Sequence, residues 1–203
     1  MASFEMTDLG KMHYFLGMEV SQEKDEIFCS QKKYTEDLLK RFNMTGCKLV
    51  AIPLIPNEKL RNEDGVKKVD ASTYRSLVGS LLYLCNTRLD ILFATSMLSR
   101  FMQCPSQIHF GTAKRVLRYL QGTIGLGMWY KKSSSIKLVG FTDNDWTGSS
   151  DDMRSTSGYC FGLGSAMLSW SSKKQGYVAQ STAEAEYVEK NSRRYRGKTV
   201  RFY

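Results

Sequence analysis

The sequence predicts a mixed α/β chain whose first two thirds are mainly helical and whose last third begins with three antiparallel strands followed by a helix. Two observations support this fold class. Apolar residues recur at intervals of three and four in several stretches between residues 31 and 120, which is the period of an amphipathic helix. From about residue 136 they form short alternating or apolar runs between turn-rich segments, as in a meander. The 203 residues, 42% hydrophobic and 24% charged, fit one or two globular domains.

The N-terminal part predicts a β-hairpin, a helix and a loop. Two short apolar strands, 14–20 and 27–30, flank a polar turn at 22–25, which is a hairpin pattern. Residues 31–42 carry apolar side chains at intervals of four and predict a helix. Pro53, Pro56 and the polar character of residues 52–70 then predict a surface loop.

Three further helices are expected before the meander. Asp70 is a suitable N-cap for a helix over 71–84, Pro105 ends a helix over 90–102, and a third helix spans 108–120. This third helix has an apolar face and a basic face, the latter formed by Lys114, Arg115 and Arg118. The meander strands are expected at 136–143, 157–163 and 166–171, and the last helix begins near residue 181.

The net charge of +9 is unevenly distributed. Residues 1–90 have no net charge, residues 91–142 carry +7, residues 143–189 carry −4 and residues 190–203 carry +6. A basic segment beside an acidic one suits a protein that binds phosphates with one surface and divalent cations with another. The charge pattern therefore favours nucleic acid and a metal ion as partners.

The same composition excludes several classes of protein. The five cysteines form no Cys-x-x-Cys pair and the two histidines stand alone, which argues against a zinc ribbon, a disulfide framework and a His-based triad. No window approaches 18 apolar residues, and the N-terminus lacks the basic and apolar regions of a secretion signal. We therefore expect no membrane span, no secretion signal and a cytoplasmic or nuclear protein.

A pair of carboxylates is the strongest candidate for chemistry. Asp143 lies at the end of the first meander strand, and Glu186 lies in the helix after the third strand. A strand-end carboxylate that faces a helical carboxylate can share Mg²⁺, and two such ions about 4 Å apart activate water for phosphodiester cleavage. The loop residues Asp145, Asp151 and Asp152 are weaker candidates for metal ligands.

Several long strings of residues resemble one family. FTDNDWTGSSDDMRSTSGYCF, LSWSSKKQ and STAEAEYV are similar to the ribonuclease H region of Ty1/copia-type retrotransposon Pol polyproteins. Upstream, DLGKMHYFLGMEV, QKKYTEDLLKRFNM, YRSLVGSLLYLCNTRLDI and AKRVLRYLQGT resemble the part of these polyproteins that follows the reverse transcriptase palm. The resemblance covers roughly residues 4–188.

This resemblance implies a division into three regions. Residues 1–130 correspond to the post-palm hairpin, thumb and connection-like region of a reverse transcriptase, and residues 131–190 to a partial ribonuclease H-like domain. Residues 191–203 form a basic tail outside the match. The implied fold is a mainly helical region followed by an incomplete ribonuclease H-like fold, which consists of the three-stranded antiparallel meander and the first helix.

The resemblance also implies roles for single residues. Asp143 and Glu186 correspond to the first two catalytic carboxylates of the ribonuclease H site and would bind Mg²⁺ or Mn²⁺. The hairpin that positions the primer terminus in reverse transcriptases is similar to Tyr14, Phe15, Leu16 and Gly17. From their charge alone, the residues expected to contact the phosphates of an RNA/DNA hybrid are Lys114, Arg115 and Arg118.

The sequence departs from the family in ways that bear on activity. The paired aspartates of the polymerase are absent, and no Asp or Glu follows Glu189 to complete the ribonuclease H carboxylates. We expect a truncated fragment that binds metal weakly and cleaves hybrids marginally or not at all, and that is not an enzyme as it stands. Without a fourth strand, the edge of the 136–143 strand is expected to be open to self-association.

Two alternatives remain beside this interpretation. The string from Arg115 to Arg118 reads Arg-Val-Leu-Arg and fits the Arg-x-Leu-Arg pattern of secreted effectors, which would make the chain a protein-interaction module. Its place inside an amphipathic helix favours an ordinary basic helix face. The second alternative is a ribonuclease H subunit whose missing carboxylates come from a partner chain.

Overall fold

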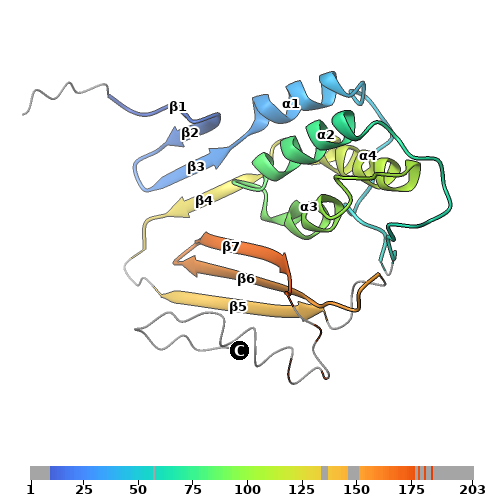
Figure 1. The fold of residues 1–203 in the computed structure, drawn as a ribbon. Coiled ribbons are helices and arrows are strands. Elements are labelled where there is room, and N and C mark those ends of the chain that lie inside the picture. The colour runs from blue at the N-terminus through green and yellow to red at the C-terminus, as the bar shows by residue number, and fades with distance from the viewer. Residues whose placement is uncertain are drawn as a thin grey trace, which may run out of the picture.

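The computed structural model describes residues 10–56, 58–133, 137–145 and 151–176, together with the single residues 178, 181 and 184. These residues form a helical block, a four-stranded antiparallel sheet and a three-stranded antiparallel sheet (Figure 1). In chain order the elements are β1 (Tyr14–Phe15), β2 (Met18–Gln22), β3 (Glu26–Ser30), α1 (Lys32–Arg41), α2 (Ala71–Leu84), η1 (Leu89–Ile91), α3 (Leu92–Ser99), α4 (Gln107–Gly122), β4 (Gly127–Lys131), β5 (Leu138–Asp145), β6 (Thr156–Leu163) and β7 (Ala166–Lys174).

Three of the predicted helices are confirmed to within two residues at each end. α2 begins after Asp70, whose carboxylate accepts a hydrogen bond of 2.7 Å from the backbone N–H of Thr73. α4 begins after Ser106, and the side chains of Ser106 and His109 cap each other's backbone N–H groups. Polar caps at both helices thus satisfy backbone donors that the helices themselves leave unpaired.

The fourth predicted helix, over 90–102, is partly wrong. A short 3-10 helix, η1, takes residues 89–91, and α3 ends at Ser99. The backbone N–H groups of Arg100 and Phe101 donate to the carbonyls three residues before them, at 3.3 and 3.2 Å, and this tighter winding ends the α-helix. Phe101 then enters the core, where 4% of it is exposed.

The N-terminal strands differ from the prediction at one point. The expected single strand over 14–20 is wrong, because the chain reverses at Leu16 and Gly17, which both have positive φ (47° and 75°). β1 therefore folds back on β2 as a tight hairpin, with Tyr14 opposite Glu19. The turn between β2 and β3 is confirmed at the predicted place.

The sequence patterns gave no indication of β4. This strand pairs antiparallel with β3, from Glu26 opposite Lys131 to Ser30 opposite Gly127, and completes the sheet in the order β1-β2-β3-β4. A Cβ atom at Gly127 would overlap the backbone carbonyl of Cys29 and come within 2.8 Å of the Phe28 ring. β4 can lie this close to β3 because residue 127 is glycine.

The predicted three-stranded meander is confirmed. β5, β6 and β7 pair antiparallel in that order, and Asp143 lies opposite Gly158. The helix expected from residue 181 lies outside the described residues, apart from positions 181 and 184. Within the described residues β5 pairs on one side, with β6, and self-association through its other edge stays a prediction.

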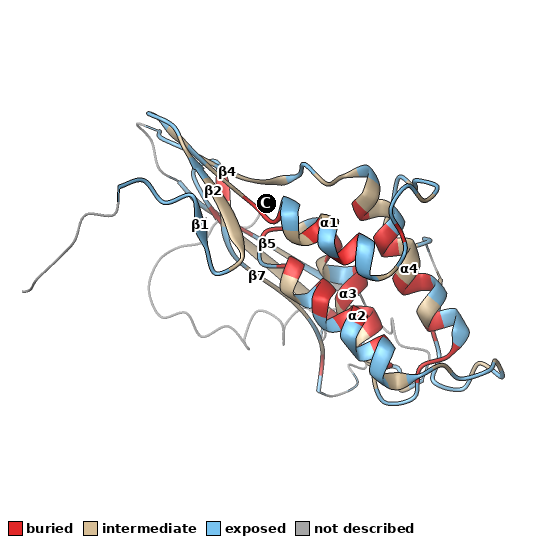
Figure 2. Cartoon of the chain, turned by 90° about the horizontal axis from the view of Figure 1, so that it is seen from above, coloured by how far each residue is buried: buried red, intermediate tan, exposed pale blue. Residues whose placement is uncertain are grey.

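The core lies between the helices. Figure 2 shows the buried residues on the faces that α1, α2, α3 and α4 turn toward one another. The buried Tyr74 satisfies its hydroxyl by donating to the carbonyl of Leu98 at 2.9 Å. Each fully buried leucine contributes about 1.5–3 kcal/mol relative to an exposed one. The fully buried apolar residues of the two longest helices are Tyr74, Leu77, Val78, Leu81, Leu84, Ala113, Val116, Leu117 and Leu120.

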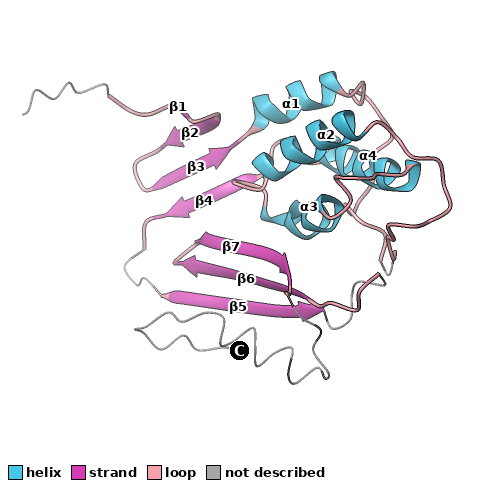
Figure 3. Ribbon diagram, in the orientation of Figure 1, coloured by secondary structure: helices cyan, strands magenta, loops and turns pink. Residues whose placement is uncertain are grey.

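The meander is attached to the helical block through β7 and α3, which lie next to each other in Figure 3. The indole N–H of Trp170 on β7 donates to the carbonyl of Cys85 at 2.8 Å, and the hydroxyl of Ser96 on α3 donates to the carbonyl of Ser172 at 2.9 Å. These bonds fix the sheet that carries Asp143 against the helices. Among the described residues, no helix combines the length and apolar character needed to cross a membrane.

Candidate functional site

A hollow of about 300 Å³ lies beside Asp143, between the meander and the start of α3. Asp143 is an exposed residue of β5. Two rings at the hollow remain largely open to solvent, with Phe93 46% and Phe141 48% exposed. We call this feature the Asp143 hollow; the residues that line it are Leu89, Leu92, Phe93, Phe141, Thr142, Asp143, Thr156, Gly158, Tyr159, Cys160, Ser171 and Ser172.

The structure places the other predicted carboxylates differently. Glu186 lies outside the described residues, as does the side chain of Asp145, and the pairing of Asp143 with Glu186 therefore stays a prediction. Asp151 accepts two hydrogen bonds from Asn62, at 3.0 and 2.6 Å. Among the described residues, no group of three His, Cys, Asp or Glu side chains could hold a metal ion.

Asp152 is held by two cations. Its carboxylate lies 2.6 Å from Nζ of Lys174 and 3.5 Å from Nε of Arg154. Lys174 is the last residue of β7, so this contact fastens the loop before β6 to the end of the meander. Asp151 and Asp152 each hold a contact within the fold, and each would have to break that contact to bind a metal ion.

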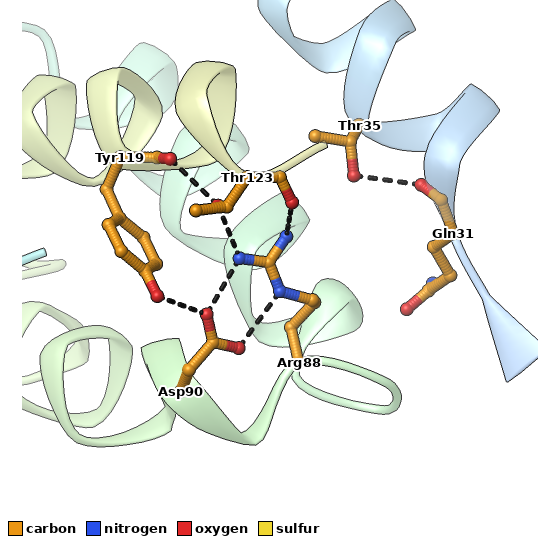
Figure 4. Close-up of polar contacts among 6 residues, drawn as sticks. All are labelled: Gln31, Thr35, Arg88, Asp90, Tyr119 and Thr123. Carbon is orange, nitrogen blue, oxygen red and sulfur yellow. Dashed lines mark hydrogen bonds and ion pairs between the residues drawn. The ribbon is translucent and has the colours of Figure 1, made fainter. Parts of the chain in front are cut away.

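A buried ion pair joins the two residues on either side of Leu89, Arg88 and Asp90 (Figure 4). The guanidinium of Arg88, 2% exposed, donates from Nε and Nη2 to the two carboxylate oxygens of Asp90 at 2.9 and 2.7 Å. It also donates to the carbonyl and the hydroxyl of Thr123, at 2.9 and 2.7 Å. Leu89, between the paired residues, lines the hollow. The cluster therefore fixes η1 against the end of α4.

The same cluster sets the charge state of its acid. Burial alone would raise the pKa of Asp90, but the hydrogen bonds and positive charge of Arg88 outweigh it. The hydroxyl of Tyr119 adds a hydrogen bond of 2.8 Å, and the pKa of Asp90 lies below its ordinary value. Asp90 is therefore ionised and fully engaged in this pair at neutral pH.

The predicted primer-terminus residues form the tip of the β1–β2 hairpin. Tyr14 is 58% exposed, Phe15 49% and Leu16 72%, so three large apolar side chains point into solvent from three consecutive positions. We call these residues and Gly17 the hairpin tip. Sequence reasoning missed the residue that supports it: the hydroxyl of Tyr83 on α2 donates to the carbonyl of Leu16. Tyr83 lies 67 positions after Leu16, and no local sequence pattern connects it with the turn.

The predicted phosphate contacts lie on α4. Arg118 is exposed, Lys114 lies with Nζ 5.0 Å from the centre of the Phe110 ring, and Arg115 is half-buried. α4 packs against α1, α2 and α3, and none of these three cations lines the Asp143 hollow. The structure therefore does not bring the basic helix face and Asp143 into one site.

Comparison with known proteins identifies the family. A family model described as reverse transcriptase (RNA-dependent DNA polymerase) matches residues 1–56. The chain is 45% identical over 184 residues to the "Retrovirus-related Pol polyprotein from transposon RE1" of Arabidopsis thaliana, which covers 91% of this chain and 13% of that protein. It is 40% identical over 186 residues to an uncharacterized mitochondrial protein of the same plant, covering 92% of this chain and 77% of that one.

The chain belongs to the Ty1/copia-type retrotransposon Pol polyprotein family. It spans about one eighth of the length of the transposon polyproteins that it matches. A shorter relative is the "Secreted RxLR effector protein 161" of Plasmopara viticola, 46% identical over 116 residues, which are 57% of this chain and 82% of that protein. No solved structure matches the chain.

Proposed function

We propose that this segment of a retrotransposon Pol polyprotein binds RNA/DNA hybrids through its hairpin tip and the basic face of α4. The observation that carries the proposal is the exposed hairpin tip, which lies inside the part of the chain that the reverse transcriptase family model matches. Exposed aromatic side chains stack on bases and sugars, and Lys and Arg side chains neutralise phosphates. The tip and α4 offer both kinds of contact.

We also propose that Asp143 is the first carboxylate of a ribonuclease H-type site that is inactive in this chain. Asp143 suits a hard cation, because it is an exposed carboxylate beside the hydroxyl-bearing residues Thr142, Ser171 and Ser172. Mg²⁺ keeps several waters and needs few protein ligands, so Asp143 could hold it weakly from β5. When bound, such an ion would neutralise phosphate charge at the Asp143 hollow.

Support for the inactive state comes from the loop carboxylates. Asp151 and Asp152 are the described acids nearest in sequence to Asp143 whose side chains the structure shows, and both are engaged. A site built for two metal ions needs additional carboxylates, and these two would have to break contacts with Asn62 and Lys174 to supply them. The described loop carboxylates nearest to Asp143 in the sequence are therefore committed to other contacts.

The test is a binding and cleavage assay on the purified chain. A fluorescently labelled RNA/DNA hybrid is titrated with protein, with fluorescence anisotropy as the readout, and the same mixture is incubated with Mg²⁺ or Mn²⁺ and analysed for RNA cleavage. We expect saturable binding that weakens with salt and in a Lys114→Gln/Arg118→Gln variant, without cleavage. Absence of binding at low salt would refute the first proposal.

The second proposal has its own control pair. Asp143→Asn and Asp25→Asn each replace one exposed carboxylate by an amide, and Asp25 lies in the β2–β3 turn away from the Asp143 hollow. RNA cleavage that Asp143→Asn abolishes and Asp25→Asn leaves intact would show an active site. If that activity elutes with a larger assembly in size-exclusion chromatography, a partner chain completes the site.

An effector role is not favoured by the structure of α4. The side chains of Val116 and Leu117, the middle residues of the Arg-x-Leu-Arg string, are fully buried in the core. Arg115 and Arg118 flank them on a helix that packs against α1, α2 and α3. The string is therefore part of the folded core in this chain, and a receptor could bind all four residues only after α4 had unfolded.

A further inference from the structure

We propose that Tyr83 is a positioning residue that locks the hairpin tip in the conformation that meets the nucleic acid. The inference rests on the proposed function of the tip and adds the part of the fold that holds it. It also assigns a role to Gly17 that goes beyond turn formation. Four observations carry it: the backbone strain at Leu16, the hydrogen bond from Tyr83, the space at Gly17, and the support around the Tyr83 side chain.

The backbone strain lies at an exposed leucine. Leu16 has φ of 47°, in the left-handed region where a bulky side chain is disfavoured. The Leu16 side chain is 72% exposed, so no burial of its own offsets that cost. A contact from elsewhere in the fold has to hold the turn in this shape.

The contact comes from α2. The hydroxyl of Tyr83 donates a hydrogen bond to the carbonyl of Leu16, across 67 positions of sequence. The carbonyl belongs to the strained residue itself, so the bond acts directly on the turn. It joins the otherwise exposed tip to a helix whose inner face lies in the core.

Gly17 makes room for this bond. Its φ of 75° favours glycine, and a Cβ atom at this position would overlap the Tyr83 hydroxyl and lie 3.1 Å from the ring carbon that bears it. Any other residue would therefore force the turn and the tyrosine hydroxyl apart. Glycine at 17 serves both the turn and the approach of the tyrosine.

Tyr83 is itself held in place. Its ring meets the ring of Tyr34 on α1 edge-on, with the centroids 4.7 Å apart and the planes at 65°. Its backbone carbonyl accepts a bond of 3.5 Å from the side chain of Gln31, which is 2% exposed and also accepts from Thr87 at 2.8 Å. The tyrosine hydroxyl thus extends from a fixed base toward the tip.

The function of this arrangement is preorganisation. A tip with three large exposed side chains on a strained turn would lose affinity if it had to be ordered at each encounter with a ligand. The Tyr83 bond orders it in advance, so Tyr14 and Phe15 meet the hybrid in one arrangement. Removing the hydroxyl should weaken binding while the core stays intact.

The experiment compares three single variants in the full chain. Tyr83→Phe removes the hydroxyl and keeps the ring, Tyr34→Phe removes a neighbouring hydroxyl that does not touch the tip, and Phe15→Ser removes a proposed contact. The probe is a labelled RNA/DNA hybrid with a recessed DNA 3′ end, measured by fluorescence anisotropy. Thermal unfolding confirms that each variant is folded, and amide hydrogen exchange reports on residues 15–18.

We expect Tyr83→Phe to weaken binding about threefold to tenfold, the factor that corresponds to the net worth of one hydrogen bond. Amide exchange should speed up at the tip and stay unchanged in α2 and α4, which a general loss of stability would not produce. Tyr34→Phe should bind like the parent chain. A fourth variant, Gly17→Ala, is added to these three and should also weaken binding, because its Cβ would overlap the Tyr83 hydroxyl.

The outcomes separate the two proposals. If Phe15→Ser leaves the affinity unchanged, the tip does not contact the hybrid, and the proposed function of the tip and the role of Tyr83 both fail. If Phe15→Ser weakens binding while Tyr83→Phe binds like the parent chain, the tip is a contact and Tyr83 does not position it. Unchanged amide exchange at residues 15–18 in Tyr83→Phe would also overturn the inference.

Discussion

Replacing Arg88 by methionine should unfold the chain at markedly lower denaturant. The variant keeps an unbranched apolar stem and removes a guanidinium that makes four hydrogen bonds while only 2% exposed. Removing one member of a buried ion pair costs about 3–5 kcal/mol, because the other charge is left uncompensated. Asp90 is 32% exposed and keeps the Tyr119 hydroxyl, so we expect the lower part of this range, about 3–4 kcal/mol.

The assay is urea denaturation followed by circular dichroism, with a double-mutant cycle. Asp90→Asn removes the acid's charge, and the double variant Arg88→Met/Asp90→Asn should be less destabilised than the sum of the two single variants by about 1 kcal/mol or more. Arg41→Met, at an exposed position in the last turn of α1, is the matched control and should change stability by less than about 0.5 kcal/mol.

Two results would refute this reasoning. A loss of less than about 0.5 kcal/mol in Arg88→Met would mean that the cluster does not hold η1 to the end of α4. Additive single effects would mean that Arg88 and Asp90 stabilise the fold separately, through packing and through Tyr119. In either case the contacts of Figure 4 would not explain why Leu89 is fixed at the Asp143 hollow.

Three further predictions concern stability. Trp170→Phe removes the indole N–H that donates to the carbonyl of Cys85, and we expect a loss of about 1 kcal/mol in chemical denaturation, whereas an unchanged midpoint would show that this bond does not attach the meander. Burial lowers the pKa of His109 in the folded chain below its ordinary value of 6.5. The neutral imidazole therefore contributes its full stability above pH 6.5, and this stability is lost as the pH falls through the lowered pKa of the folded state. A melting temperature that stays level from pH 7.5 to 5 would contradict this. Gly127→Ala places a methyl group 2.8 Å from the Phe28 ring and against a backbone carbonyl, and we expect a loss of about 1–3 kcal/mol that the same change at Gly125, in open space, does not reproduce.

Local signals predicted the helices and the meander well. Asp70 before a helical pattern located the start of α2, because an N-cap acts on the residues next to it. The alternating runs after residue 136 located β5 to β7, since neighbouring strands with short turns pair with each other. Here the information needed for the structure lies within a few residues of the element.

The features that sequence reasoning missed depend on distant partners. β4 is a strand because it pairs with β3, about one hundred positions earlier, and its own five residues carry little pattern. The reversal at Leu16 is stabilised by Tyr83, a residue of α2 that no local pattern connects with the turn. Asp143 was found from its place in a motif, but the wall of its hollow includes Leu92 and Phe93, which belong to α3.

The pairing of β3 with β4 has a consequence for how the chain is assembled. Together the two strands close a loop of roughly 100 residues that contains all the helices of the block, and the entropy of such a closure grows only slowly with length. During synthesis, β1 to β3 leave the ribosome long before β4. The edge of β3 that pairs with β4 therefore stays unpaired until the chain through α4 has been made. Conversely, a cut in the loop over residues 58–70 would leave two pieces that still share a sheet and a core. Such pieces should recombine when mixed, which would make the chain a natural candidate for a split-protein reporter.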